Sequence, residues 1–308
     1  MLDLALLTTR RLDRPVDGAL LLSRLCAHEQ LVPEKCGVYD PLNVAFDRSQ
    51  IDRIASELWH ESGFNWKREK PKQEGMAGPE SLPHVHASVH LSVWDNDLAE
   101  VLIEYLRSEA IQLGADIGYV EPDWPGKTGS SSAFFERSSP SIAQEEFDQI
   151  GRGYYTVQLK DFLVQLKWAT VFGPPYVRMF GRKTLLTAPA AVVEEIAPEM
   201  IYLQLTASVG DVSADLPAFF SLRRRVKAHI GSDAFFDPVK GKGPYRVPKF
   251  SLAPWGAPRP LGFIDGKPVI GLIAGRPVVQ MPEGPKILDI QWTPPKYGPL
   301  NGDQDAGS

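Results

Sequence analysis

The chain has 308 residues, of which 43% are hydrophobic and 23% are charged, and its formal net charge at pH 7 is −5. These are values of a globular protein with room for one large domain or two ordinary ones. They exclude a disulfide framework, because Cys26 and Cys36 are the only cysteines, and no apolar run approaches the roughly 20 residues that cross a bilayer. Residues 1–14 carry arginines after their apolar run, the reverse of a secretory signal, so we expect a soluble, cytoplasmic protein.

The first quarter of the chain predicts two helices and a loop. Residues 19–31 are leucine-rich with helical spacing. Residues 47–61 form a better helix, because Asp47 is a capping residue and Gln50 completes a capping box. Residues 67–83 are charged and contain three prolines and two glycines, so we expect a mobile loop there.

The next stretch predicts one α/β unit. Residues 85–94 alternate apolar and polar side chains, which is typical of a half-buried strand. Asp95 and Asp97 then offer a helix cap, and an amphipathic helix follows as far as Gly114. Residues 117–120 read as the next strand.

The region after this unit is predicted in less detail. Residues 124–142 break all periodicity and indicate an exposed loop, and residues 154–159 are strand-like. Residues 161–172 fit either a helix or a strand. Gly173, Pro174 and Pro175 should end that element, and residues 176–180 then predict a short strand that Gly181 closes.

The second half of the chain continues with alternating elements. Thr187, with Pro189 in the first turn, predicts a helix to about residue 196. Residues 200–206 predict a strand, and the apolar stripe after Asp215 predicts a helix that Gly231 ends. We therefore expect an α+β fold, with mixed or mainly antiparallel sheets and packed helices, over residues 1–236. Residues 237–308 form a Pro/Gly-rich extension, in which residues 261–281 predict a small meander of three strands.

Few residues suggest catalysis. His84, His86 and His90 would share one strand face, but a rise of about 3.3 Å per residue puts the outer two roughly 20 Å apart, too far to share a metal ion. A pair formed by His84 and His86 with a carboxylate from elsewhere stays open as a metal-dependent hydrolase or nuclease. The chain has no G-x-S-x-G, G-x-G-x-x-G or P-loop motif. We expect no catalytic residue, cofactor or metal.

The charge is distributed unevenly along the chain. Residues 95–148 hold twelve acidic and three basic residues, an arrangement that would attract a basic protein partner, although a solvated helix face explains it equally well. The candidate partner-binding residues are Asp95, Asp97, Glu100, Glu104, Glu121 and Asp123, with Trp94 and Trp124 as aromatic anchors.

A basic stretch lies further along. Residues 223–249 hold eight basic and two acidic residues, and a nucleic-acid adaptor would use the run at its start: Arg223, Arg224, Arg225 and Lys227. The run follows the apolar stripe of a helix, where a solvated face is the default, and lacks interleaved aromatic residues.

Residues 168–181 read W-A-T-V-F-G-P-P-Y-V-R-M-F-G, and residues 201–206 read I-Y-L-Q-L-T. This pattern resembles the central signature of bacterial immunity protein family fifty-two, which is found in polymorphic-toxin systems. The resemblance implies a cytoplasmic protein that is made beside a toxin, often a type VI secretion effector, and that neutralises a nuclease similar to restriction endonucleases. The family offers no catalytic residues. Its shared residues are expected to be structural and are matched here by Trp168, Gly173, Pro174, Pro175, Tyr176, Arg178 and Gly181.

Overall fold

The computed structural model describes three parts of the chain. The first is residues 1–122, apart from residues 11, 13, 39–40, 60–63 and 83–84. The second is residues 162–237 together with residues 240 and 244–250. In the tail it describes residues 262–265, 267–273, 276–281 and 284–290.

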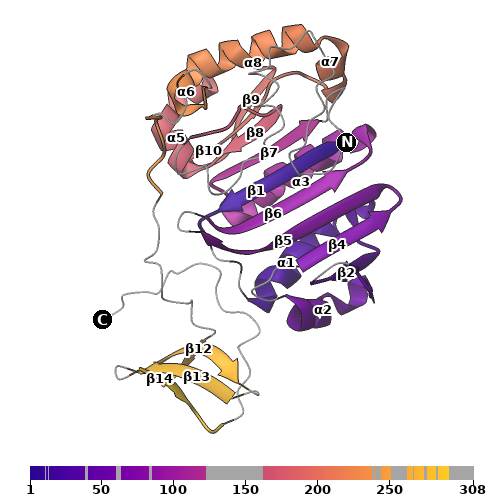
Figure 1. The fold of residues 1–308 in the computed structure, drawn as a ribbon, viewed down its shortest axis with the longest axis vertical. Helices are drawn as coiled ribbons and strands as arrows, with labels where there is room; N and C mark the ends of the chain where they lie inside the picture. Colours follow the sequence, from indigo (N-terminus) through magenta and orange to yellow (C-terminus); the bar gives the residue numbers. More distant parts are fainter. Residues whose placement is uncertain are drawn as a thin grey trace.

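The described chain is built on a ten-stranded antiparallel sheet (Figure 1). The strands lie in the order β3-β2-β4-β5-β6-β1-β7-β8-β10-β9. Their bounds are β1 Leu2–Thr8, β2 Lys35–Gly37, β3 Val44–Ala45, β4 Phe64–Glu69, β5 Lys72–Leu82, β6 Val85–Val93, β7 Ile117–Pro122, β8 Ala169–Phe172, β9 Val192–Ala197 and β10 Met200–Gln204. The predicted α+β class with an antiparallel sheet is confirmed.

Helices pack against both faces of this sheet. They are α1 Pro15–Leu25, α2 Ile51–Leu58, α3 Ala99–Leu113, α5 Pro174–Phe180, α6 Arg182–Leu186, α7 Val209–Ala214 and α8 Leu216–Ile230, with 3-10 turns η1 Glu29–Leu31, η2 Arg48–Gln50, η3 Asn96–Leu98 and η4 Ser232–Ala234.

One sheet face packs against α3 and carries Leu4 and Leu6 of β1. A Cβ added to Gly118 of β7 would lie 2.5 Å from Leu6 and 3.1 Å from Leu106 of α3, which shows how closely this helix approaches. We call this side the α3 face.

The opposite face packs against α5 and α8. Glu121 of β7 points to this side, and it meets Arg223 of α8 at 2.8 Å. Phe172 of β8 also points there, and its ring lies 5.4 Å from that of Phe180 in α5. We call this side the α8 face. Figure 1 shows α8 crossing over the end of the sheet that holds β8, β9 and β10.

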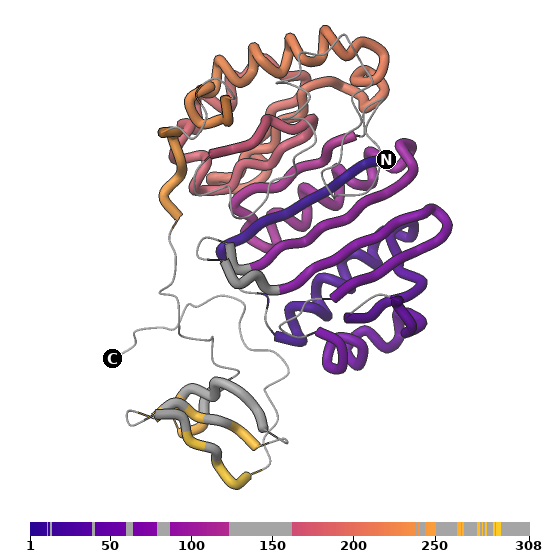
Figure 2. Tube along the Cα trace, in the orientation of Figure 1, coloured from indigo at the N-terminus to yellow at the C-terminus, as the bar shows by residue number. Residues whose placement is uncertain are grey.

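Strand β1 occupies the middle of the sheet, where Figure 2 shows it between β6 and β7. It pairs antiparallel with both, Leu4 lying opposite Leu91 on one side and Val120 on the other. The predicted unit of strand, helix and strand therefore exists as β6, α3 and β7, but its two strands are not neighbours.

Elements with a clear period and a cap were predicted well. Strand β6 and strand β7 match their predictions closely, helix α3 ends at Gly114 with φ of 59°, and Asp215 caps α8 by accepting a hydrogen bond from the Ala218 amide. Strand β10 also lies where expected. The helices expected at residues 19–31 and 47–61 are present but shorter, as α1 with η1 and as η2 with α2.

The predicted loop at residues 67–83 is wrong, because it forms part of β4 and all of β5. Its charges pair across the two strands, Lys67 opposite Glu74. Gly75 leaves room for a large neighbour, since a Cβ there would lie 2.1 Å from the Trp66 ring. Charge and glycine thus belong to strand pairing here, and not to a loop.

Two short elements around the central motif are also corrected. Residues 176–180 belong to helix α5 and not to a strand, because Pro174 stands at the first helical position, where a missing amide hydrogen costs nothing. Residues 192–197 form strand β9 and not a helix, because they pair with β10. Tertiary pairing overrides the local helix signal of Thr187 and Pro189.

The tail forms a separate antiparallel meander. It has four strands in sequence order, one more than predicted: β11 Gly262–Ile264, β12 Lys267–Ile273, β13 Arg276–Met281 and β14 Gly284–Ile287. The loop predicted at residues 124–142 and the strand predicted at residues 154–159 lie outside the described residues. The division at residue 236 stays a prediction.

Candidate functional site

Five of the eight predicted partner-binding residues lie between the end of β6 and the first turns of α3: Trp94, Asp95, Asp97, Glu100 and Glu104. The Asp95 carboxylate accepts a hydrogen bond from the Asp97 amide at 3.0 Å and so caps the turn that begins the helix. Asp97, Glu100 and Glu104 are exposed, and acids in a first helical turn are favoured by the helix dipole. Trp94 is half-buried, with the Lys72 ammonium 4.3 Å from its ring.

Glu121 does not belong to this exposed surface. It is only 3% exposed, and Arg223, which is 2% exposed, donates to it at 2.8 Å. Its second carboxylate oxygen accepts from the Trp168 amide at 2.5 Å. Alternation along β7 points this side chain to the α8 face, so the prediction that it binds a partner is wrong.

The same ion pair removes Arg223 from the basic run that a nucleic-acid adaptor would use. Arg224 and Arg225 are exposed on α8, whereas Lys227 is half-buried with its ammonium 5.1 Å from the Phe235 ring. The run is therefore a mixture of core and surface side chains, and not a continuous basic stripe.

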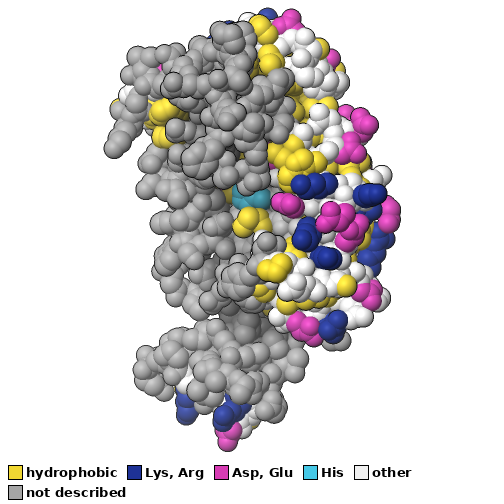
Figure 3. Space-filling model, turned by 45° about the vertical axis from the view of Figure 1, so that its right-hand side comes forward, with side chains coloured by type: hydrophobic (Ala, Val, Ile, Leu, Met, Phe, Trp, Pro, Cys, Tyr) yellow, Lys and Arg dark blue, Asp and Glu magenta, His cyan; other side chains and the backbone are white. Residues whose placement is uncertain are grey.

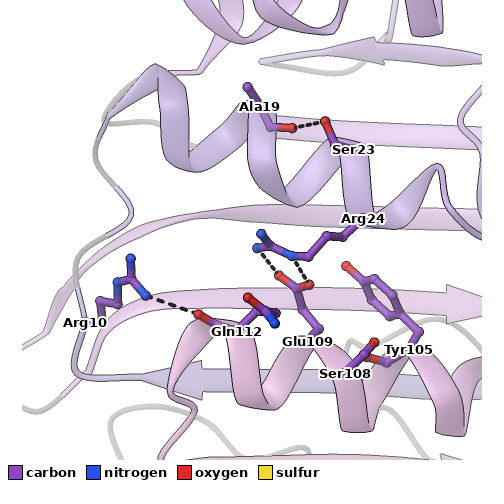
Figure 4. Close-up of polar contacts among 8 residues, drawn as sticks. All are labelled: Arg10, Ala19, Ser23, Arg24, Tyr105, Ser108, Glu109 and Gln112. Carbon is purple, nitrogen blue, oxygen red and sulfur yellow. Dashed lines mark hydrogen bonds and ion pairs between the residues drawn. The ribbon is translucent and has the colours of Figure 1, made fainter. Parts of the chain in front are cut away.

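Glu109 and Asp116 are also buried, which reduces the acidic region further. Figure 4 shows Glu109 of α3 bound by Arg24 of α1, at 2.5 and 2.7 Å, beside Tyr105. Burial raises the pKa of the Glu109 carboxyl, and the hydrogen bonds from Arg24 oppose that shift. This pair joins α3 to α1.

Asp116 connects α3 to β7 and sets a pH-dependent stability. Its carboxylate accepts from the Thr9 amide at 2.6 Å, and burial raises the pKa of Asp116 to about 6. The folded chain therefore holds this proton more tightly than the unfolded chain, so stability falls as the pH rises from about 4 to 6.

We expect Asp116→Asn to remove this fall, because asparagine still accepts from Thr9 but carries no charge. The free energy of unfolding of each protein is measured in urea at pH 4 and at pH 7. Between these two pH values, the difference in unfolding free energy between variant and parent should shift by about 2 kcal/mol in favour of the variant. The same pH dependence in both proteins would contradict this role of Asp116.

Of the predicted partner-binding residues, Asp123 and Trp124 lie outside the described residues. The same is true of His84 and of the side chain of His86, on which the metal hypothesis rests. His90 lies on the α8 face of β6, where burial lowers its pKa, against the charge of Asp3. Within the described ranges, no group of three or more His, Cys, Asp or Glu side chains could hold a metal ion. Both cysteine thiols are free.

The exposed acids of α3 are joined by one that sequence reasoning missed, Glu194 of β9. Arg107 of α3 pairs with Glu194, and its guanidinium lies 5.0 Å from the Tyr202 ring of β10. Burial is the main cause that raises the pKa of Tyr202. The nearby charges of Glu100 and Glu194 raise this pKa further, whereas the charge of Arg107 lowers it. These acids are thus neighbours in space. We call Asp97, Glu100, Glu104 and Glu194 the acidic face.

Residues 192–197 read V-V-E-E-I-A and show no alternation, so the β-branched side chains of Val192, Val193 and Ile196 were the available signal for a strand that carries Glu194. Figure 3 shows basic and acidic side chains interspersed on the described part of one side of the molecule. The candidate site is accordingly the acidic face at the α3 and β9 end of the sheet.

The residues of the central motif are not part of the acidic face. Trp168 and Tyr176 are fully buried, and the Trp168 indole donates to Thr206 at 2.9 Å. Gly181 has φ of 89°, which favours glycine. Arg178 is exposed and pairs with Glu199 at 2.9 Å. Pro175 is buried and Pro174 is half-buried at the start of α5.

No known protein-family model matches this chain, and no curated protein is detectably similar to it. Among the described residues, no helix is both long enough and apolar enough to span a membrane.

Proposed function

We propose that this chain is an immunity protein that binds and neutralises a nuclease-type toxin in the cytoplasm of the producing cell, without bond chemistry of its own. The observation that carries the proposal is the acidic face, whose four carboxylates are exposed on η3, α3 and β9. The resemblance of residues 168–206 to the immunity family supports the same reading.

A nuclease is a suitable partner for such a face. It must bind a polyanionic backbone, so the surface around its active site carries lysine and arginine side chains. An acidic protein surface attracts those side chains, speeds the encounter and fixes the orientation of the complex. Occupying the same surface as the nucleic acid would also prevent the substrate from binding.

The acidic face is rigid before a partner arrives. Leu102, Tyr105 and Leu106 fix α3 on the sheet and are fully buried. The ion pair between Arg24 and Glu109 holds the same helix from the side. A surface that is already ordered loses less conformational entropy on binding, and this favours tight inhibition.

Co-expression tests the function directly. The full chain is produced together with the nuclease toxin encoded by the adjacent gene, and growth and co-purification are measured. We expect growth to be restored and the two proteins to purify as one complex. Continued toxicity, or separate elution of two folded proteins, would contradict the proposal.

Charge reversal tests the part played by the acidic face. We expect Glu100→Lys/Glu104→Lys to slow association with the toxin roughly tenfold at low salt and to make the rate less dependent on ionic strength, because the steering field is weakened. Stopped-flow or surface-based kinetics at two salt concentrations measures both effects.

The matched control is Asp52→Lys/Glu57→Lys, which reverses two exposed acids on α2 at the other end of the sheet. It changes the net charge by the same amount. If both double variants slow association equally, net charge and not the acidic face is responsible.

A further inference from the structure

Strand β9 presents an open backbone edge. It pairs with β10 on one side, and in the described part of the chain no strand pairs with its other side. The opposite edge of the sheet is β3, which has only two residues. Proteins usually shorten or cover their edge strands, because unpaired amides and carbonyls can receive another strand. The six-residue β9 is therefore the longer of the two exposed edges.

The register shows which residues of β9 point outward. The Gly173 amide donates to the Asp116 carbonyl beside β7, and the Leu205 amide donates to the Trp168 carbonyl beside β8. Leu205 itself lies just beyond β10, where the chain leaves the regular strand and its carbonyl accepts from the Ala191 amide on the β9 side. In antiparallel pairing, residues alternate between the two neighbours, so Leu203 turns toward β8 while Tyr202 and Gln204 turn toward β9.

The partners of those two residues on β9 follow from the same register. Glu194 lies opposite Tyr202, and Val192 lies opposite Gln204, so both turn their backbone groups inward to β10. Val193 consequently directs its amide and carbonyl away from the sheet. Glu195 lies beside a shift of register between Met200 and Ile201, so the regular edge is centred on Val193. A strand added at this edge would bond to Val193.

The two sides of the edge differ in charge. On the α3 side lie the acids of the acidic face, with Arg107 as the basic residue among them. On the α6 side, Arg182 pairs with Glu195 and Arg178 pairs with Glu199, while Lys183 is exposed. An incoming strand would therefore fit best with basic side chains toward α3 and neutral or acidic side chains toward α6.

We propose that β9 receives an extended segment of the toxin as an additional strand, with basic side chains against Glu100, Glu104 and Glu194. This inference rests on the proposed function and specifies how the partner binds. Main-chain hydrogen bonds supply affinity in this mode of binding, and alternate side chains supply specificity.

A second copy of the chain fits the edge less well. Two-fold antiparallel pairing of β9 with itself keeps both α3 faces on the same side of the joined sheet. The acidic faces of the two copies would then lie next to each other, and like charges across a contact are unfavourable. The charge pattern favours a basic partner strand.

The test compares Val193→Pro with Val193→Ala in the full chain. Proline removes the outward amide and is tolerated at such an edge position, whereas alanine keeps the amide and removes most of the same side chain. Affinity for the toxin of the adjacent gene is measured by calorimetry. We expect Val193→Pro to weaken binding at least about tenfold and Val193→Ala to weaken it much less.

Hydrogen exchange on the parent chain keeps the test valid if the proline variant misfolds. The amide of Val193 should become protected in the complex. Unchanged exchange at this amide, or equal affinities for the two variants, overturns the inference while the proposed function stands. Failure of the parent chain to bind the toxin overturns both. Self-association of the free chain that Val193→Pro abolishes would assign the edge to a second copy and overturn the inference.

Discussion

Replacing Arg223 with methionine is expected to lower the free energy of unfolding of the full chain by about 3–5 kcal/mol. Arg223 and Glu121 are both almost completely removed from solvent, and their atoms lie 2.8 Å apart. Without the guanidinium, the carboxylate of Glu121 keeps the Trp168 amide but has lost the cation that neutralises it. A buried charge without its counter-ion is among the most destabilising changes a protein core can undergo.

The double variant Glu121→Gln/Arg223→Met should recover a substantial part of that loss, because it removes the charge together with its partner. Arg225→Met is the matched control on the exposed side of the same helix and should change stability by less than about 0.5 kcal/mol. Urea unfolding of the parent chain, of the single variants Glu121→Gln and Arg223→Met, and of the double variant gives the coupling between the two residues. A single variant at Arg223 as stable as the control would contradict the role of the pair.

This pair also shows why charge counting along the sequence overstated the acidic region. Glu109, Asp116 and Glu121 are as acidic in the sequence as Glu100 and Glu104, and nothing local separates them. Burial is decided by distant elements: α1 brings Arg24 to Glu109, and α8 brings Arg223 to Glu121. Within the described residues, the exposed acids at the start of α3 are what remains of the predicted site.

The elements that could be predicted are those whose own residues determine them. Strand β6 alternates, α3 has a cap and a C-terminal glycine, and α8 has an apolar stripe between Asp215 and Gly231. Strands β1, β5 and β9 have no such local signal in their own residues. Leu6 and Leu7 of β1 are buried on opposite faces, so this strand shows no alternation. Strands β5 and β9 are defined by the neighbours they pair with, which a single sequence does not reveal.

Gly173→Ala is expected to cost at least about 3 kcal/mol of unfolding free energy, because the site cannot accommodate even one methyl group. A Cβ at residue 173 would lie 2.0 Å from the Ala115 carbonyl oxygen and 2.9 Å from the Asp116 backbone. These are main-chain atoms of the connection between α3 and β7, and the Gly173 amide itself donates to Asp116 at 2.9 Å. A flexible side chain could move aside, but this backbone is held by the strands on either side.

Gly210→Ala is the control, since its Cβ would meet only the Ser208 hydroxyl, at 3.2 Å, and alanine is the better helix former in α7. Thermal unfolding should therefore separate the two variants clearly. The comparison also bears on the acidic face, because Gly173 braces the end of α3 against α5. If the proposed function holds, Gly173→Ala should lose toxin protection through loss of folded protein, and the remaining folded fraction should bind with unchanged affinity. Retention of full stability by Gly173→Ala would show that the close approach of these two backbones does not constrain the fold.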